Sequence, residues 1–128
     1  MTDISTAKFQ KQLNGGLCSL VLLGLLEQSG EDLYGYDIAK RLAKSPEGKS
    51  IFKEGTLYPV LRSLAAARLL TSRIVLSYAG PPRRYYGITD QGRATLREWK
   101  LMWTGTRRFV DGFIASDQPP GFTAPPSA

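Results

Sequence analysis

The chain has 128 residues, the length of one compact domain with room for an arm or a tail. It holds one cysteine and no histidine, which excludes an internal disulfide and a Cys/His zinc site and removes the commonest general base of enzymes. The net charge of +6 is unevenly spread: residues 53–108 contain eleven basic and three acidic residues, the rest six and eight. This local excess of positive charge favours a polyanion partner such as nucleic acid. The alternative is that these basic residues form an ordinary surface exposed to water. We therefore expect neither an enzyme nor a bound metal or cofactor.

The first predicted element is a helix over residues 13–27, preceded by a polar N-terminal arm over residues 1–12. Its apolar run, "LCSLVLLGLL", has ten residues, whereas a membrane span needs about 20, and the flanks of a secretion signal are missing. We therefore expect a cytoplasmic protein with no membrane partner. Because the helix is apolar on nearly every side, a partner subunit is expected to cover part of it. Cys18 is interpreted as an inert buried thiol, the alternative being a redox-active or ligand-facing one.

Two further helices are predicted next. In "LYGYDIAKRLAK" (residues 33–44), Ile38 and Leu42 lie one helical turn apart, and "SPEGKS" (residues 45–50) ends the helix. The following helix is predicted over about residues 55–70, because its apolar residues recur at intervals of three and four.

A hairpin and a last helix complete the predicted elements. "RIVLSY" and "RRYYGIT" flank "AGPP", which predicts two short strands around a Gly-Pro-Pro turn. Thr89 can cap a last helix that runs to about Ile114. Its apolar stripe is long enough to be a dimerisation element and comprises Leu96, Trp99, Trp103, Thr106, Val110 and Phe113. Residues 116–128 have the composition of a disordered tail.

Helix, helix, helix, hairpin, helix is the element order of a winged helix-turn-helix domain. The expected fold is therefore mainly α with a small β-hairpin. Residues 13–88 would form the winged helix-turn-helix DNA-binding domain, and residues 89–115 a long C-terminal dimerisation helix. In such a domain the third helix enters the DNA major groove by its N-terminus.

The stretch "EGTLYPVLRSL" puts a proline inside the first turn of that third helix. If Thr56 is the N-cap, Pro59 is the third helical residue, where an amide has no acceptor in the helix, so proline loses no hydrogen bond. Gly55 permits close approach of another molecule, and the free amides suit a phosphate. Thr56, Tyr58 and Arg62 would present a hydroxyl, a phenol and a guanidinium. The alternative is an ordinary core helix with Tyr58 packed inside.

Three segments, "LYGYDIAKRL", "FKEGTLYPVLRSLAAARLL" and "GPPRRYYGITDQGRATL", together resemble the PadR family of bacterial transcriptional regulators over roughly residues 13–100. The resemblance implies a winged-helix homodimer, usually a repressor and sometimes released by a small ligand, with an interface built from the first and last helices. With one C-terminal helix, the chain resembles the short subfamily. By position, the resemblance implies DNA-reading roles for Thr56, Leu57, Tyr58, Pro59 and Arg62, phosphate contacts for Tyr34 and Tyr36, and a wing at Gly80, Pro81, Pro82, Arg83 and Arg84.

Trp99 and Trp103 lie one turn apart on the dimer stripe. Facing copies would form an aromatic slot for a planar hydrophobic effector, and plain interface packing is the alternative. The expected function is sequence-specific binding of a palindromic DNA operator by a homodimeric repressor. The alternative is a helical dimer that binds a protein or a small molecule and keeps the winged scaffold only as a frame.

Overall fold

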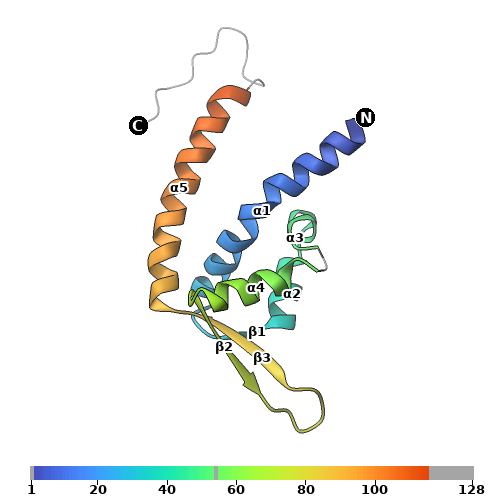
Figure 1. The fold of residues 1–128 in the computed structure, drawn as a ribbon, viewed down its shortest axis with the longest axis vertical. Coiled ribbons are helices and arrows are strands. Elements are labelled where there is room, and N and C mark those ends of the chain that lie inside the picture. Colours follow the sequence, from blue (N-terminus) through green and yellow to red (C-terminus); the bar gives the residue numbers. More distant parts are fainter. Residues whose placement is uncertain (1, 54, 116–128) are drawn as a thin grey trace.

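The computed structural model describes residues 2–53 and 55–115 (Figure 1). Its elements are α1 (Thr2–Ser29), β1 (Leu33–Tyr34), α2 (Gly35–Leu42), α3 (Pro46–Ile51), α4 (Leu57–Ala66), β2 (Leu70–Val75), β3 (Arg83–Ile88) and α5 (Asp90–Ile114). α1 and α5 contact each other near the sheet and then diverge, while the β2–β3 hairpin projects on the opposite side of the molecule. The fold is mostly helical with a small antiparallel sheet and a long last helix, as the sequence predicts.

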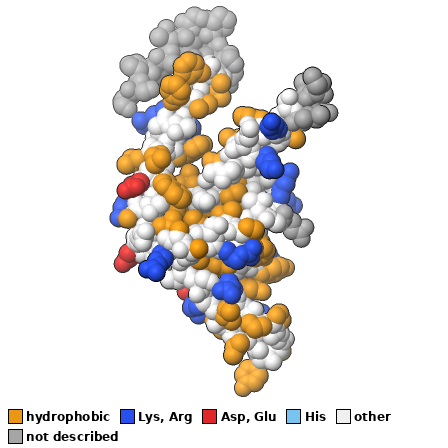
Figure 2. Space-filling model, in the orientation of Figure 1, with side chains coloured by type: hydrophobic (Ala, Val, Ile, Leu, Met, Phe, Trp, Pro, Cys, Tyr) orange, Lys and Arg blue, Asp and Glu red, His pale blue; other side chains and the backbone are white. Residues whose placement is uncertain are grey.

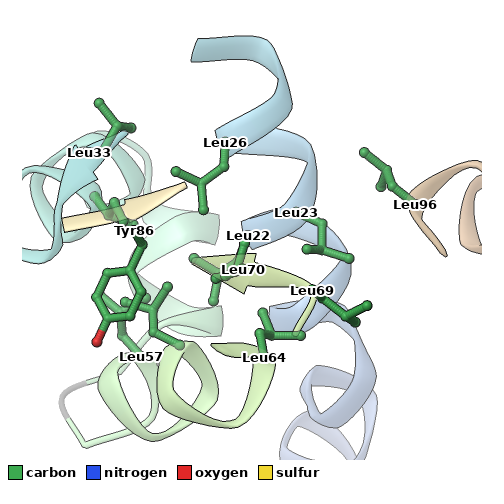
Figure 3. Close-up of a cluster of buried hydrophobic side chains, with 12 residues drawn as sticks. Leu22, Leu23, Leu26, Leu33, Leu57, Leu64, Leu69, Leu70, Tyr86 and Leu96 are labelled. Atoms are coloured by element: carbon green, nitrogen blue, oxygen red, sulfur yellow. The ribbon is translucent and has the colours of Figure 1, made fainter. Parts of the chain in front are cut away.

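The core forms around the second half of α1, where Leu22, Leu23 and Leu26 are buried (Figure 3). Burying one such leucine stabilises the fold by about 1.5–3 kcal/mol. The other elements contribute Leu33, Ile38, Leu57, Leu61, Leu64, Leu69, Leu70, Tyr86 and Leu96. α1 is packed by α4, by β3 and by α5, which explains why this segment is apolar on nearly every side.

The sheet is antiparallel, with β3 in the centre and β1 and β2 on either side. β2 and β3 pair along all six residues of each strand. β1 has two residues, and Tyr34 in it lies opposite Tyr85 of β3. Because α2 starts immediately after β1, this short pairing brings the start of α2 beside the base of the hairpin.

The first helix begins at Thr2 rather than at Leu13, so the polar segment predicted as an arm is helical and continuous with the core helix. Lysine and glutamine, which are frequent in this segment, are good helix formers. The side-chain amide of Gln10 also donates to Asn14 Oδ1 one turn later, at 2.8 Å. Polarity here indicates exposure to solvent and not the end of the helix.

The segment 45–50, predicted to end the second helix, follows the end of α2 and also opens an additional helix, α3, that the sequence analysis did not predict. Ser45 is its N-cap and accepts a hydrogen bond from the Gly48 amide at 3.0 Å, and Pro46 takes the first helical position. Serine followed by proline is a helix start as well as a turn signal, because the first amides of a helix need no internal acceptor.

The strand boundaries also differ from those predicted. Leu33 and Tyr34, expected to open the second helix, pair with β3 instead. β2 begins at Leu70 rather than at Arg73. Arg68 has a φ of +63°, and a residue in this left-handed conformation ends α4 and redirects the chain into the strand.

The start of α5 is as predicted. Thr89 Oγ1 accepts a hydrogen bond from the Gly92 amide at 2.9 Å and caps the helix. The same hydroxyl lies 2.8 Å from the carbonyl oxygen of Arg68 and 3.1 Å from that of Leu69. One side chain therefore joins the segment that follows α4 to the base of α5.

Within residues 2–53 and 55–115, no helix is long and apolar enough to cross a membrane. The tail predicted over residues 116–128 lies outside the described residues. The domain boundaries drawn from the sequence stay predictions.

Candidate nucleic-acid interface

The start of α4 presents polar groups to solvent. Thr56 occupies the N-cap position, as predicted, but its side chain makes no capping hydrogen bond, since its backbone is already helical, with φ −93° and ψ −44°. Gly55, just before it, has a φ of +90°, a conformation that suits glycine. Pro59 is the third helical residue and is exposed. The amides of this first turn have no acceptor within the helix.

The family resemblance implied a DNA-reading role for Leu57, and the structure places its side chain in the core. Its side chain is 4% exposed and packs in the core, so it anchors α4 and cannot reach a base edge. Tyr58, Pro59 and Arg62 are exposed on the other side of the helix. The outward face of α4 therefore carries the remaining predicted residues.

Tyr58 combines packing with exposure, so neither sequence interpretation of it is complete. Its side chain is 40% exposed, yet a Cβ added at Gly35 would lie 3.2 Å from Tyr58 Cε1. Desolvation by burial, followed by the neighbouring phenols of Tyr34, Tyr36 and Tyr86, raises the pKa of Tyr58 above the ordinary tyrosine value. The phenol is therefore protonated at neutral pH and can donate a hydrogen bond.

The predicted wing residues are all exposed, at the tip and the first positions of β3: Gly80, Pro81, Pro82, Arg83 and Arg84. The side chains of Arg83 and Arg84 point to opposite faces of the hairpin, as neighbours in a strand do. Arg84 Nη1 donates to Ser72 Oγ at 2.8 Å. Arg83 extends over β1, where its Cζ lies 5.1 Å from the ring centroid of Tyr34.

Three aromatic rings lie between the hairpin and α2, and we call them the tyrosine cluster: Tyr34, Tyr36 and Tyr85. The ring centroids of Tyr34 and Tyr36 are 6.2 Å apart, and those of Tyr34 and Tyr85 are 5.9 Å apart. Tyr34 is therefore the central ring of the cluster, and it is also the ring that Arg83 contacts. Tyr36 is more than half exposed, which leaves its phenol open to solvent.

Two further cations border the tyrosine cluster. Lys40 Nζ lies 5.5 Å from the ring centroid of Tyr36, and Arg73 Cζ lies 5.0 Å from that of Tyr85. Arg73 also pairs with Asp32, Nε to Oδ2 at 3.0 Å, which ties β2 to the connection before β1. A cation over an exposed ring contributes about 0.5–1 kcal/mol. Sequence reasoning missed Lys40, Arg73 and Tyr85. Strand pairing brings Arg73 and Tyr85 to the other tyrosines, whereas Lys40 lies one helical turn after Tyr36 on α2.

The start of α4, the start of α2 and the first residues of β3 form one continuous surface. Tyr58 packs against Gly35, which is the next residue after Tyr34 in the chain. The guanidinium of Arg83 in turn lies over the ring of Tyr34. On the face drawn in Figure 2, Lys and Arg side chains lie over the α4 region and the upper hairpin, while Asp and Glu side chains lie mainly along the α5 edge. A basic surface with hydroxyl groups and free helix amides suits the phosphate backbone of DNA.

Trp99 and Trp103 lie on α5, outside this surface. Trp99 packs partly buried against the core, whereas Trp103 is 40% exposed. The projecting parts of α1 and α5 carry further uncovered apolar side chains: Phe9, Leu13, Leu101, Met102, Phe109, Val110, Phe113 and Ile114. The aromatic slot predicted from the tryptophans requires a second copy of the chain and stays a prediction.

An exposed helix start and a basic wing that share one face, on a core of helices and a small sheet, define a winged helix-turn-helix protein. Comparison with known proteins narrows this class. The family model described as the transcriptional regulator PadR-like family matches residues 22–98. An uncharacterized protein of Lysinibacillus sphaericus is 30% identical over 102 residues, which are 80% of this chain and 91% of that protein.

Two solved structures of PadR family regulators have a fold similar to that of this chain. A PadR family transcriptional regulator from Eggerthella lenta superposes with a TM-score of 0.74 at 28% identity, over 91% of this chain and 97% of that one. A PadR-like transcriptional regulator from Bacillus cereus gives a TM-score of 0.66 at 30% identity, over 83% and 99%. The chain belongs to the PadR-like family of transcriptional regulators and is a DNA-binding regulator rather than an enzyme, which confirms the resemblance seen in the sequence.

Proposed function

We propose that this protein represses transcription by binding a specific, palindromic operator as a homodimer. The observation that carries the proposal is the continuous surface from Tyr58 through the tyrosine cluster to Arg83. In this arrangement α4 enters the major groove by its N-terminus, and the hairpin lies along the adjacent backbone. A repressor bound in this way blocks access of other proteins to the operator.

The two parts of the surface have different roles in the proposal. Thr56 and Tyr58 stand at the tip of α4 and donate hydrogen bonds to base edges, with Arg62 one turn behind. Arg83, the amides at the start of α4 and the phenol of Tyr36 hold phosphates. Phosphate contacts set the affinity and its salt dependence, while only groove contacts select a sequence.

A second copy of the chain would cover part of the exposed apolar surface of α1 and α5. Phe9 and Leu13 on α1, and Val110 and Phe113 on α5, are all more than 40% exposed in one chain. Covering this much apolar surface favours association with a second copy along the diverging ends of α1 and α5 (Figure 1). Two-fold symmetry then sets the two copies of α4 about 34 Å apart, one turn of DNA.

The central experiment is selection of bound fragments from random duplex DNA, followed by affinity measurements over a range of salt concentrations. A palindromic consensus, with an affinity that falls steeply as salt rises, is the expected result. A single unpaired half-site would contradict the homodimer. Weak binding that does not depend on salt would contradict the DNA-binding surface and favour the alternative, a dimer that binds a protein or a small molecule.

A further inference from the structure

The far end of the β2–β3 hairpin carries apolar side chains that the described residues leave largely uncovered. Ile74 is more than half exposed, Leu76 is 81% exposed, and Tyr78 is fully exposed. Figure 2 shows hydrophobic side chains at the end of the hairpin that lies farthest from the core. Apolar residues scattered singly over a surface are ordinary, but a group of them on a projecting element indicates a contact surface. We call Ile74, Leu76 and Tyr78 the wing-tip cluster.

The strand register explains why Ile74 is uncovered. Ser72 lies opposite Tyr86, whose ring is buried in the core. Because alternate residues of a strand point to the same side, Ile74 shares the side of Ser72 and Tyr86. The hairpin has passed the edge of the core at this point, since Ile74 does not belong to the buried cluster. Its apolar surface therefore contributes little to the core and is open to another molecule.

The charge around the wing-tip cluster favours nucleic acid as that molecule. Residues 70–89 contain three arginines and no acidic residue. Arg73 pairs with Asp32, whereas Arg83 and Arg84 form no ion pair within the described residues. Arg83 belongs to the surface proposed for DNA, so the cluster continues that surface toward the end of the hairpin. Cations followed by apolar groups match a duplex, which has phosphates outside and stacked bases inside.

Two prolines stiffen the support of the cluster. The loop between β2 and β3 comprises residues 76–82, and it ends with Pro81 and Pro82 directly before β3. Each proline ring fixes its φ at about −65°, which removes freedom from the loop. A side chain can separate two stacked base pairs only if its support does not yield. A stiff loop that presents Leu76 and Tyr78 meets this requirement.

We infer that Leu76 and Tyr78 enter the minor groove beside each half-site, wedge between two base pairs and bend the operator. Apolar side chains that insert in this way partly unstack a base step and kink the duplex by about 20–90°. The steps TA and CA/TG are deformed most easily, so the wing tip selects such a step without a hydrogen bond to a base. The inference rests on the proposed function for the placement of the hairpin on DNA. It adds a source of sequence preference that is separate from α4.

The first test measures the bend and the unstacking with the full chain and the selected operator. Energy transfer between dyes at the two ends of the duplex should increase when the wild-type chain binds, because a bend brings the ends together. 2-Aminopurine in the flanking step should become brighter as it unstacks. Leu76→Ser and Tyr78→Ser should each remove most of both signals and weaken operator binding by about threefold to tenfold. A duplex that stays straight and stacked with the wild-type chain would overturn the inference.

Conservative variants and a matched control separate the wedge from a general loss of apolar surface. Leu76→Met and Tyr78→Phe keep an apolar group at the tip and should keep the bend. Leu101→Ser removes a leucine of similar exposure, 76% against 81%, on α5 and should change neither signal. If Leu76→Ser and Tyr78→Ser bend the operator as the wild-type chain does, the wing tip is not the wedge. If they also fail to repress transcription in a reconstituted assay, the cluster contacts a protein instead of DNA.

The second test measures the preference for a base step. Fragments selected by the wild-type chain should carry TA or CA/TG at a fixed distance outside each half-site. Replacing that step by AA should weaken wild-type binding several-fold and leave binding by Leu76→Ser unchanged. Equal wild-type affinity for both steps would show that the wing tip selects no sequence. A chain that binds its operator without bending it overturns this inference alone, whereas a chain that binds no duplex DNA overturns the proposed function as well.

Discussion

Arg83 of the wing is held over the ring of Tyr34, with its Cζ 5.1 Å from the ring centroid. Tyr34 belongs to β1, and the pairing of β1 with β3 is what brings the ring under the guanidinium. This cation–π contact restricts a long, flexible side chain before DNA arrives, and the guanidinium N–H groups can still donate to a phosphate.

Arg83→Ala should weaken binding to all duplex DNA about equally, because a phosphate contact carries no sequence information. The slope of log affinity against log salt should decrease by about one, as expected for the loss of one phosphate contact. Filter binding at several salt concentrations, on the selected operator and on random DNA, measures both effects. A changed sequence preference would show that Arg83 reads a base instead.

Tyr34→Leu should weaken operator binding by about threefold to tenfold and leave the salt slope unchanged, because Arg83 is still present but no longer ordered. Tyr34→Phe is the matched control, since it keeps the ring and loses only the hydroxyl. If Tyr34→Phe binds the operator as weakly as Tyr34→Leu does, the hydroxyl of Tyr34 itself contacts DNA, and the proposal that its ring orders Arg83 is wrong. Circular dichroism of both variants checks that β1 still pairs.

The affinity for DNA should change by less than about twofold between pH 6 and 7.5. The chain has no histidine, and burial raises the pKa of both Tyr58 and Cys18 above their ordinary values, so neither group adds a charge change in this range. Operator binding at constant ionic strength measures this. At higher pH the unfolded chain loses these protons before the folded chain does, so the free energy of unfolding should decrease as the pH rises through the raised pKa values. Urea titrations at increasing pH test that sign, and Tyr58→Phe should weaken the dependence.

Local patterns were enough to predict most of the fold. The intervals between Leu57, Leu61 and Leu64 placed α4, and the turn "AGPP" between two alternating segments placed the hairpin. Thr89 was recognised as a cap because the amide that its side chain accepts from, that of Gly92, lies only three residues further along the chain. Each of these features depends on neighbours in the chain, which the sequence displays directly.

Features that depend on distant pairing were missed. β1 has two residues, too few for an alternating pattern, and it exists only because β3 supplies its hydrogen-bond partners. Arg73 consequently gave no sign of its place beside the tyrosine cluster, whereas the spacing of Lys40, one helical turn after Tyr36, was a local signal that sequence reasoning overlooked. The burial of the Leu57 side chain was missed for a related reason, since position in a motif does not tell which side of a helix faces the core.

Gly92→Ala should destabilise the fold by about 1–3 kcal/mol, because the added Cβ would overlap the carbonyl oxygen of Leu69. Gly105→Ala is the matched control on the same helix. A Cβ there meets no atom within 4 Å, so the substitution should stabilise the fold by about 0.5–1 kcal/mol. Thermal unfolding of both variants measures the difference. Equal stability of the two variants would mean that α5 does not pack closely on the end of α4.

Val110→Glu tests the homodimer. Val110 lies two helical turns from Trp103 on the apolar stripe of α5 and is 43% exposed in one chain, so a charge there would be buried by a second copy. Sedimentation should show a monomer, and operator affinity should fall by about 100-fold, because each half-site is then bound alone. Leu101→Glu is the control: Leu101 lies nine residues away, on the opposite side of the helix, and should keep both the dimer and the affinity. A dimeric Val110→Glu variant, or a wild-type chain that is monomeric at working concentration, would remove the physical basis for a two-fold operator.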